Sequence, residues 1–197
     1  ISNYGADAAR LFILSDSPPE KDVQWSEEGI VSSFKFVQKL WNLNLKILNE
    51  IKKNHSQDED GEITKHTNKF IKKVTDNLEN FSYNKIIANM HEIYAFFNKQ
   101  LDKNYTKNTI VTNYHKILVL MLPVLPHFAN ECIEVLKARE KIIWPSFDKD
   151  LFQENEVTIV VQINGKKRGI LNSVKNVNEE NLMKLVFGDK KLNKYLI

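Results

Sequence analysis

The chain has 197 residues, of which 42% are apolar and 27% charged, so it falls in the ordinary globular range and can bury a sizeable core. Its longest apolar runs fall short of the roughly 18 residues that a membrane-spanning helix needs, which argues against a membrane protein. A lone cysteine, Cys132, cannot form an internal disulfide, and this favours a reducing, cytoplasmic setting.

The formal net charge is +3, and its placement along the chain is uneven. Residues 151–197 hold eight Lys and Arg against five Asp and Glu, whereas residues 1–150 hold twenty of each. All the excess positive charge therefore lies in the last quarter of the chain. Because Ile1 is not a natural start residue, we expect a fragment of a longer polypeptide.

The first predicted helix covers residues 6–15, with Asp7 and Arg10 three apart as a candidate side-chain pair. Pro18 and Pro19 end it, because a residue before proline avoids the helical region. Ser26 is typical of a helix N-cap, and two glutamates follow it in the first turn, where the helix dipole favours negative charge.

The helix that begins at Ser26 carries apolar residues at three- and four-residue steps, which predicts one buried face. These residues are Ile30, Phe34, Val37, Trp41, Leu45 and Leu48. On this stripe Trp41 is predicted to lie in the core, while Trp25 is expected to seal the preceding loop. The polar run 52–61, which includes Asp58, is a surface connection.

Four more helices are predicted before residue 150. The third carries Ile63, Thr67, Phe70, Val74 and Leu78, and the fourth starts near Ser82 and carries Ile86, Met90, Ile93, Phe97 and Leu101. The fifth runs over 106–122, and the sixth covers 127–137, where His127 is expected to cap or pack. Long helices with brief connections predict an antiparallel helix bundle.

The pattern changes after Trp144 and Pro145. A β-branched run over 157–163 is followed by Asn164-Gly165 and a second run over 166–171, which predicts a β-hairpin with a type I′ turn. Asn178 then begins a last helix that ends near Gly188. The fold class is therefore mainly α, a bundle followed by a small, incomplete α+β domain with a ββα order.

Catalytic motifs do not stand out in this sequence. A glycine-rich phosphate loop, a nucleophile elbow and a Cys/His cluster at metal spacing are all absent from it. We therefore predict no catalytic residue, no cofactor-binding residue and no metal ligand within the chain.

The strongest candidate for a binding site is the basic run Gly165-Lys166-Lys167-Arg168-Gly169 at the predicted hairpin tip. Three consecutive cations on a rigid turn can neutralise the phosphates of a nucleic acid. A solvated, lysine-rich turn is the alternative reading. Lys72 and Lys73 are weaker candidates for the same role, because charged pairs are common on the outer face of bundle helices.

Several segments resemble leucyl-tRNA synthetases in order and spacing. They are YGADAARLFIL, SPPEKDVQWSEEGI with Pro18, Pro19, Glu20 and Trp25, LMLPVLPHFANECIEVL, WPSFDKDLF and VQINGKKRGIL. Class I enzymes for valine, isoleucine and methionine share the first pattern, whereas the second points to the leucine enzyme of the bacterial type. The resemblance covers nearly the whole chain.

The resemblance implies three parts: a segment after the KMSKS loop over 1–25, a helical anticodon-binding-type domain over 26–150, and part of the C-terminal domain over 151–197. It implies a monomeric enzyme that attaches leucine to tRNA(Leu) using ATP and magnesium, with catalytic and editing domains elsewhere in the polypeptide. Recognition of the tRNA would be by shape, through phosphates and 2′-hydroxyls.

Carried over by motif, Lys166, Lys167 and Arg168 match the basic stretch of the family's hairpin, with Lys72 and Lys73 as further tRNA-binding candidates. Arg10 and Trp25 are expected to brace the catalytic loop that lies upstream in the family. Two alternatives remain: the same region of a valyl or isoleucyl enzyme, and a helical scaffold that binds another protein. Such a scaffold should expose an apolar patch.

Overall fold

The computed structural model describes residues 1–16, 22–53, 61–103, 105–137, 141–149, 156–163, 165–174, 177–189 and 192. Outside these ranges lie Pro18, Pro19 and Glu20, Asp58 with most of the polar run, Asn164, and residues 194–197. The chain divides into two compact units, Ile1–Leu151 and Phe152–Ile197. The three-part division at residues 25 and 150 stays a prediction.

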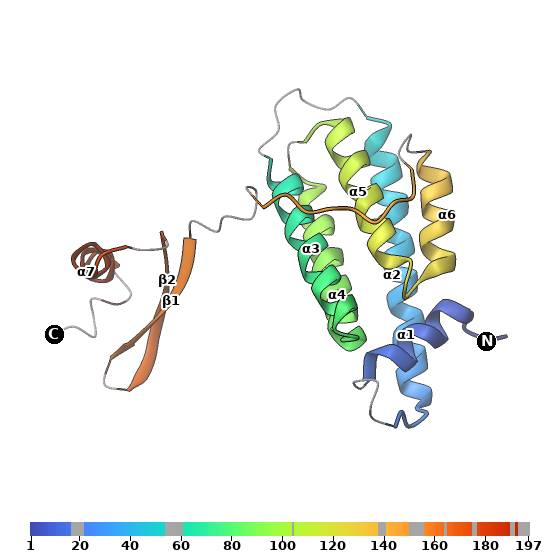
Figure 1. Ribbon diagram of the computed structural model, residues 1–197, viewed down its shortest axis with the longest axis horizontal. Helices are drawn as coiled ribbons and strands as arrows, with labels where there is room; N and C mark the ends of the chain where they lie inside the picture. Colours follow the sequence, from blue (N-terminus) through green and yellow to red (C-terminus); the bar gives the residue numbers. More distant parts are fainter. Residues whose placement is uncertain are drawn as a thin grey trace. The chain divides into compact units, whose positions relative to one another are not determined.

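The first unit is a bundle of helices joined by short connections (Figure 1). Its helices are α1 (Ala6–Asp16), α2 (Glu27–Ile51), α3 (Glu62–Glu79), α4 (Tyr83–Gln100), α5 (Lys107–Met121) and α6 (Pro126–Leu136). The predicted fold class is confirmed, with helix ends within a few residues of the expected ones. Among the described residues no helix is both long and apolar enough to cross a membrane.

Two of the helix starts depend on local side-chain caps. The Ser26 hydroxyl accepts a hydrogen bond from the Gly29 amide, and the Thr106 hydroxyl accepts one from the Thr109 amide. Each cap satisfies an amide that has no partner within its own helix. Because Ser and Thr at these positions fix where α2 and α5 begin, both starts could be read from the sequence.

The buried face of α2 differs from the predicted one. Its buried residues are Ile30, Ser33, Phe36, Leu40, Leu43, Asn44 and Ile47, whereas Trp41 is 38% exposed and Leu45 44% exposed. The prediction that Trp41 lies in the core was wrong. Apolar residues occur around much of α2, so two stripes fit a helical period, and packing against the other helices selected the one that includes Ser33 and Asn44.

An extended segment over 141–149 follows the last bundle helix and crosses over α5 and α3 (Figure 1). The Asn68 side chain fixes it, because its amide donates to the Asp148 carbonyl at 2.6 Å and its oxygen accepts from the Asp148 amide at 2.6 Å. The Trp144 indole also donates to the Thr75 hydroxyl at 3.0 Å. These contacts make the segment part of the first unit.

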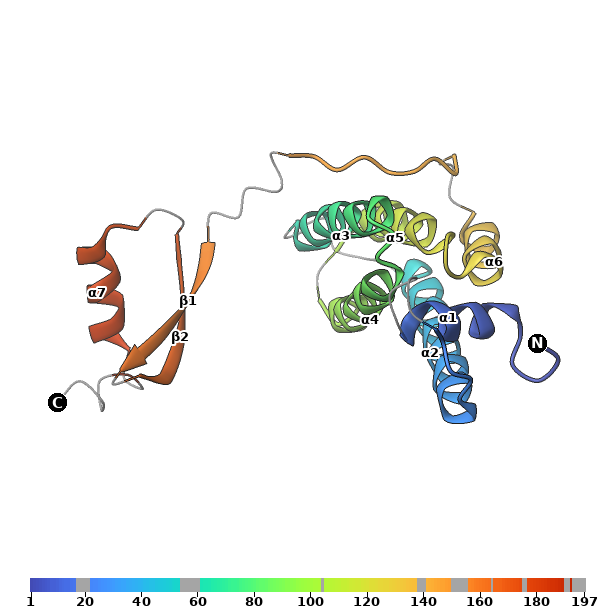
Figure 2. The same cartoon turned by 60° about the horizontal axis from the view of Figure 1, so that its bottom comes forward.

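The second unit is an antiparallel hairpin with a helix: β1 (Glu156–Ile163), β2 (Lys166–Val174) and α7 (Glu179–Gly188) (Figure 2). The Asn178 side chain caps α7 by accepting from the Asn181 amide. Ile163 pairs with Lys166 in the ladder, so two residues form the turn, as predicted. Strand β2 extends to Val174, three residues beyond the predicted end at Leu171.

Candidate nucleic-acid interface

The hairpin tip presents the predicted cations in two different ways. Gly165 has a φ of 72°, a left-handed conformation that glycine adopts readily, and it leads directly into β2. Lys166 and Lys167 are exposed, whereas Arg168 is half-buried. The two lysines are therefore free to meet a ligand from solution, while part of the Arg168 side chain packs against the unit.

A β-bulge explains why neighbouring cations differ. Val161 pairs with Gly169 and Gln162 pairs with Lys167, so Arg168 is the extra residue on β2. A bulge interrupts the simple alternation of side chains and re-aims the residue it contains. The sequence could not reveal this irregularity, because the Lys-Lys-Arg run alone gives no sign of a register shift.

Gly169 makes room for the side chain of Leu192. A Cβ atom at this position would lie 2.8 Å from Cδ2 of Leu192, which is buried. No real Cβ tolerates such an approach unless the neighbour moves. The two glycines that flank the basic run therefore have different roles. Gly165 adopts the positive φ of the turn, and Gly169 leaves space for the Leu192 side chain.

Lys72 and Lys73 on α3 are both engaged in ion pairs. Lys72 pairs with Asp76 and lies over the Phe147 ring, 5.7 Å from its centroid. Lys73 pairs with Glu92 of α4 at 2.8 Å. The carboxylates of Asp76 and Glu92 lower the positive potential that Lys72 and Lys73 would offer to a phosphate. A role in tRNA binding stays a prediction, and the structure gives it less support than the hairpin lysines receive.

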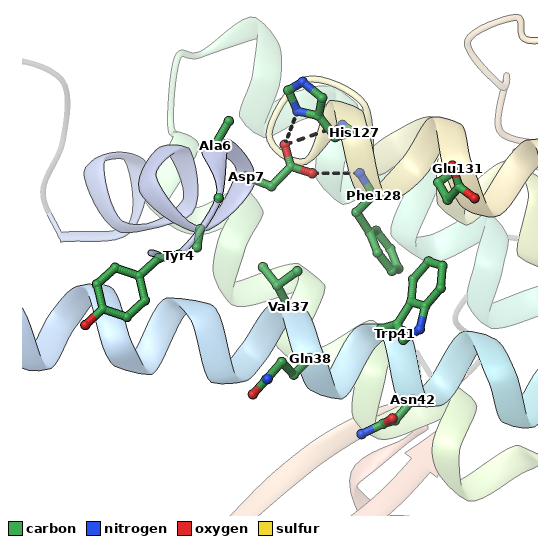
Figure 3. A pocket seen from close by; sticks show the side chains of 12 residues that line it. Tyr4, Ala6, Asp7, Val37, Gln38, Trp41, Asn42, His127, Phe128 and Glu131 are labelled. Atoms are coloured by element: carbon green, nitrogen blue, oxygen red, sulfur yellow. Dashed lines mark hydrogen bonds and ion pairs between the residues drawn. The ribbon is translucent and has the colours of Figure 1, made fainter. Parts of the chain in front are cut away.

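Arg10 and Asp7 do not pair with each other, although they lie three residues apart on α1. The Arg10 guanidinium donates to the Pro123 carbonyl at 2.8 Å and to the Val124 carbonyl at 3.3 Å. The Asp7 carboxylate accepts from the Phe128 amide at 2.7 Å and contacts the His127 ring at 2.8 Å (Figure 3). Both residues therefore hold the corner between α5 and α6.

Asp7 supplies the N-terminal cap that α6 lacks locally. Leu125 occupies the N-cap position and has no side-chain hydrogen bond to the helix, and Pro126 has no amide hydrogen. The Asp7 carboxylate oxygens accept hydrogen bonds from the backbone amides of His127, at 3.4 Å, and of Phe128. A carboxylate in this place also matches the positive end of the helix dipole. Arg10 thus has a structural task within this unit, and bracing of a catalytic loop stays a prediction.

Trp25 lies beside the junction of α1 and α2. The Trp25 and Phe12 rings are in a T-shaped arrangement with the centroids 5.2 Å apart, and Trp25 is 61% exposed. Gly29 allows Phe12 to cross the first turn of α2, because a Cβ there would lie 2.4 Å from the Phe12 ring. Trp25 therefore covers one side of Phe12, and its proposed contact with a catalytic loop stays a prediction.

A groove of about 770 Å³ opens between α1, α2 and α6 (Figure 3). Val37, Trp41 and Phe128 supply apolar walls, and Asp7, His127 and Glu131 supply polar ones. Of the described residues that line it, none is Lys or Arg. Because phosphate binding needs cationic partners, this groove is a poor site for RNA phosphates.

Two buried ionisable groups of the bundle, Cys132 and Tyr114, are held in their neutral forms. Burial raises the pKa of the Cys132 thiol to about 12, and burial raises the pKa of Tyr114 well above its usual value of 10.0. A thiol that stays protonated is a poor nucleophile. Within the described ranges no group of three or more His, Cys, Asp or Glu side chains is arranged to hold a metal ion.

Comparison with known proteins identifies relatives that span this whole region. Residues 60–183, from the start of α3 into α7, match the family described as "Anticodon-binding domain of tRNA ligase". Leucine--tRNA ligase of Brucella anthropi is 34% identical over 205 aligned residues, which cover 94% of this chain and 23% of that protein. The enzyme of Orientia tsutsugamushi is 33% identical, with 98% and 23% covered.

The fold has a solved counterpart as well. The chain matches part of an agnB2 LeuRS of Agrobacterium radiobacter, solved in a ternary complex with tRNA and LeuAMS, with a TM-score of 0.77 and 21% identity. This match covers 98% of the chain and 26% of that structure. The chain spans about a quarter of the length of the relatives it matches. The resemblance to leucyl-tRNA synthetases is confirmed, and the chain belongs to the anticodon-binding domain family of tRNA ligases.

Proposed function

We propose that this chain is the tRNA-binding portion of a leucine--tRNA ligase. In the proposed enzyme, other domains of the polypeptide activate leucine with ATP and magnesium and edit mischarged tRNA, and this chain holds tRNA(Leu). The enzyme acts in the cytoplasm as a monomer. The observation that carries the proposal is the similarity of curated leucine--tRNA ligases over 94% to 98% of the chain.

The hairpin provides the physical means for such binding. Lys166 and Lys167 project into solvent from a two-residue turn, and Arg168 follows at a bulge. Cations that displace the counterions of an RNA backbone gain affinity that falls steeply with salt. Because A-form RNA offers side chains little access to its deep groove, contacts to phosphates and 2′-hydroxyls suit the recognition of a folded tRNA.

A salt titration of tRNA binding tests the proposal. In the leucine--tRNA ligase that contains this chain, the variant Lys166→Ala, Lys167→Ala, Arg168→Ala should bind tRNA(Leu) more weakly. The slope of log affinity against log salt should fall by about 2 to 3, because up to three phosphate contacts are lost. An unchanged slope would assign the basic tip to an ordinary solvated turn.

The matched control replaces three ion-paired lysines, Lys53, Lys103 and Lys184, by Ala. These residues pair with Glu50, Glu62 and Glu180. The control removes the same formal charge, so it should reproduce any effect of net charge alone. Its slope should change by less than about one, because each lysine already has a carboxylate beside it.

The alternatives make different predictions. The curated relatives named above are leucine enzymes, which disfavours a valyl or isoleucyl specificity. A helical scaffold for another protein would use the groove that contains Trp41 and Phe128, whose apolar walls are open to solvent. Under that reading Trp41→Ala would abolish partner binding and the hairpin variant would leave every binding reaction unchanged.

A further inference from the structure

The solvent-facing side of α2 carries a second concentration of positive charge. Lys35, Lys39 and Lys46 are exposed. At about 100° per residue these three positions fall within an arc of about 40°, and at 1.5 Å per residue they span about 16 Å along the helix. They therefore form a straight row of cations, called the α2 lysine stripe below.

No acidic residue lies between the lysines of the α2 lysine stripe, and the flanking acids of the helix are Glu28 before it and Glu50, which pairs with Lys53, after it. Residues 29–49 contain no Asp or Glu. Within the described part of the chain no ion pair involves Lys35, Lys39 or Lys46, whereas Lys53, at the end of the same helix, pairs with Glu50 at 2.6 Å. The positive potential of the stripe is therefore available to a partner.

Helix α4 extends this surface with neutral polar groups. Lys46 Nζ donates to the Asn98 side-chain oxygen at 2.9 Å, and the His91 ring stacks on Phe36 with the centroids 3.7 Å apart. The Glu92 carboxylate pairs with Lys73 of α3, so it is committed to another partner. Burial, together with the charge of Lys39, lowers the pKa of His91.

The composition of the stripe favours a polyanion over a protein partner. Between and beside the three lysines lie Ser32, Asn42 and Asn49, which are exposed polar residues. A protein interface normally buries an apolar centre, and this row offers none. Phosphates need only cations and hydrogen-bond donors, which lysine and asparagine side chains supply.

We propose that the α2 lysine stripe, with Asn98 and His91 of α4 at its edge, binds the phosphate backbone of a folded RNA. The inference rests on the proposed function and adds a second contact surface to the hairpin tip. The straight row recognises the regular backbone of an A-form stem, and it reads no base sequence. The groove lined by Trp41 and Phe128 borders this surface at Asn42, and no Lys or Arg is among the described residues that line it.

The test compares two triple variants of the full 197-residue chain. The first changes Lys35, Lys39 and Lys46 to Gln, and the control changes the ion-paired Lys53, Lys103 and Lys184 to Gln. Gln keeps helix propensity close to that of Lys, and both variants lose three charges. The probe is a fluorescent tRNA(Leu) transcript titrated at several salt concentrations.

The stripe variant should bind about 10- to 100-fold more weakly near 0.1 M salt, and its salt slope should fall by about 2 to 3, while the control slope changes by less than about one. Equal slopes for the two variants would overturn the inference. If the hairpin variant alone weakens binding, the proposed function stands and the stripe has no role. If the unmodified chain does not bind the transcript, the inference fails, whereas the proposed function is tested separately by the titration of the ligase that contains this chain.

A second measurement needs no variant, so it holds even if a triple substitution disturbs folding. Lysine acetylation of the unmodified chain, read by mass spectrometry, should slow at Lys35, Lys39 and Lys46 when the transcript is present and stay constant at Lys53. Equal acetylation rates with and without RNA would contradict the inference. Poly-glutamate should compete poorly with the transcript; equal competition would show that the stripe responds to negative charge alone and would overturn the assignment to RNA.

Discussion

In the bundle, buried side chains from six helices share one core, whereas the described part of the ββα unit buries only Ser173, Val186 and Leu192. The same unit leaves apolar side chains exposed on both the sheet and the helix: Val160, Ile170, Met183, Leu185 and Phe187. Burial of apolar area is the main stabilising contribution to a fold. A single contact therefore matters more to the ββα unit than to the bundle.

This difference decides whether a substitution in a basic surface affects only binding or also local folding. The bundle can carry exposed cations on α2 without loss, because its core contains residues such as Leu40 and Ile117 that are almost wholly buried. Among the described residues of the ββα unit, the hairpin that carries the cations has few other contacts, so its two strands depend on α7 and Leu192. Changes that disturb the hairpin should therefore affect binding and local folding together.

The largest expected effect is on the hairpin. Gly169→Ala should destabilise the ββα unit by about 1–3 kcal/mol, because the new Cβ would lie 2.8 Å from Leu192. Amide hydrogen exchange across β1 and β2 measures this loss. Gly188→Ala is the control, since a Cβ there meets no atom within 4 Å. Leu192→Ala alone should also lower the protection, so the test is a double-mutant cycle: Gly169→Ala should cost less in the Leu192→Ala background than in the unmodified chain, and an equal cost in both would contradict the steric explanation.

A somewhat smaller effect is expected in the bundle. Asp7→Ala removes the acceptor for two amides at the start of α6 and should lower the free energy of unfolding by about 1–2 kcal/mol. Urea unfolding followed by circular dichroism measures this change. Asp22→Ala is the control, because Asp22 is exposed. Equal losses for the two variants would show that the cap contributes nothing specific.

The smallest effect is a loss of bundle stability in mild acid. Burial lowers the pKa of His66 and His91 from 6.5 in the folded state, so folding disfavours protonation of both rings. Their contribution is fully present above pH 6.5 and is lost as the pH falls from there through the lower folded pKa. Both rings are partly exposed, and solvent screening keeps the effect small.

Thermal unfolding at several pH values measures this dependence. The midpoint should fall as the pH drops below 6.5, and the variant His66→Gln, His91→Gln should show a flatter profile than the unmodified chain. A midpoint that rises in mild acid would contradict the direction of both shifts. An identical profile for the variant would assign the dependence to other groups.

Local rules made much of the fold predictable from the sequence. Ser26, Thr106 and Asn178 mark helix starts because their side chains cap neighbouring amides, and the Asn-Gly pair marks a turn that Gly165 completes. Each of these signals acts within about four residues, which is the range over which sequence patterns are informative.

The features that sequence reasoning missed depend on distant contacts. Asp7 and Arg10 were expected to pair because they are three residues apart, but their partners lie more than 110 residues away. Trp41 was placed in the core because it fits one of two apolar stripes on α2, and only the other helices decide between them. The α2 lysine stripe was overlooked because its potential depends on where the Glu92 carboxylate of α4 points, and that carboxylate pairs with Lys73 of α3.

The pair of contacts from α1 has a geometric consequence for the whole helical unit. Asp7 receives the amides that begin α6, while Arg10 holds the carbonyls just before them, and both act from a single turn of α1. Adding one residue between them would rotate one contact by about 100° relative to the other. The azimuth of α1 and the bend between α5 and α6 are thus locked to one another, so neither can be altered alone.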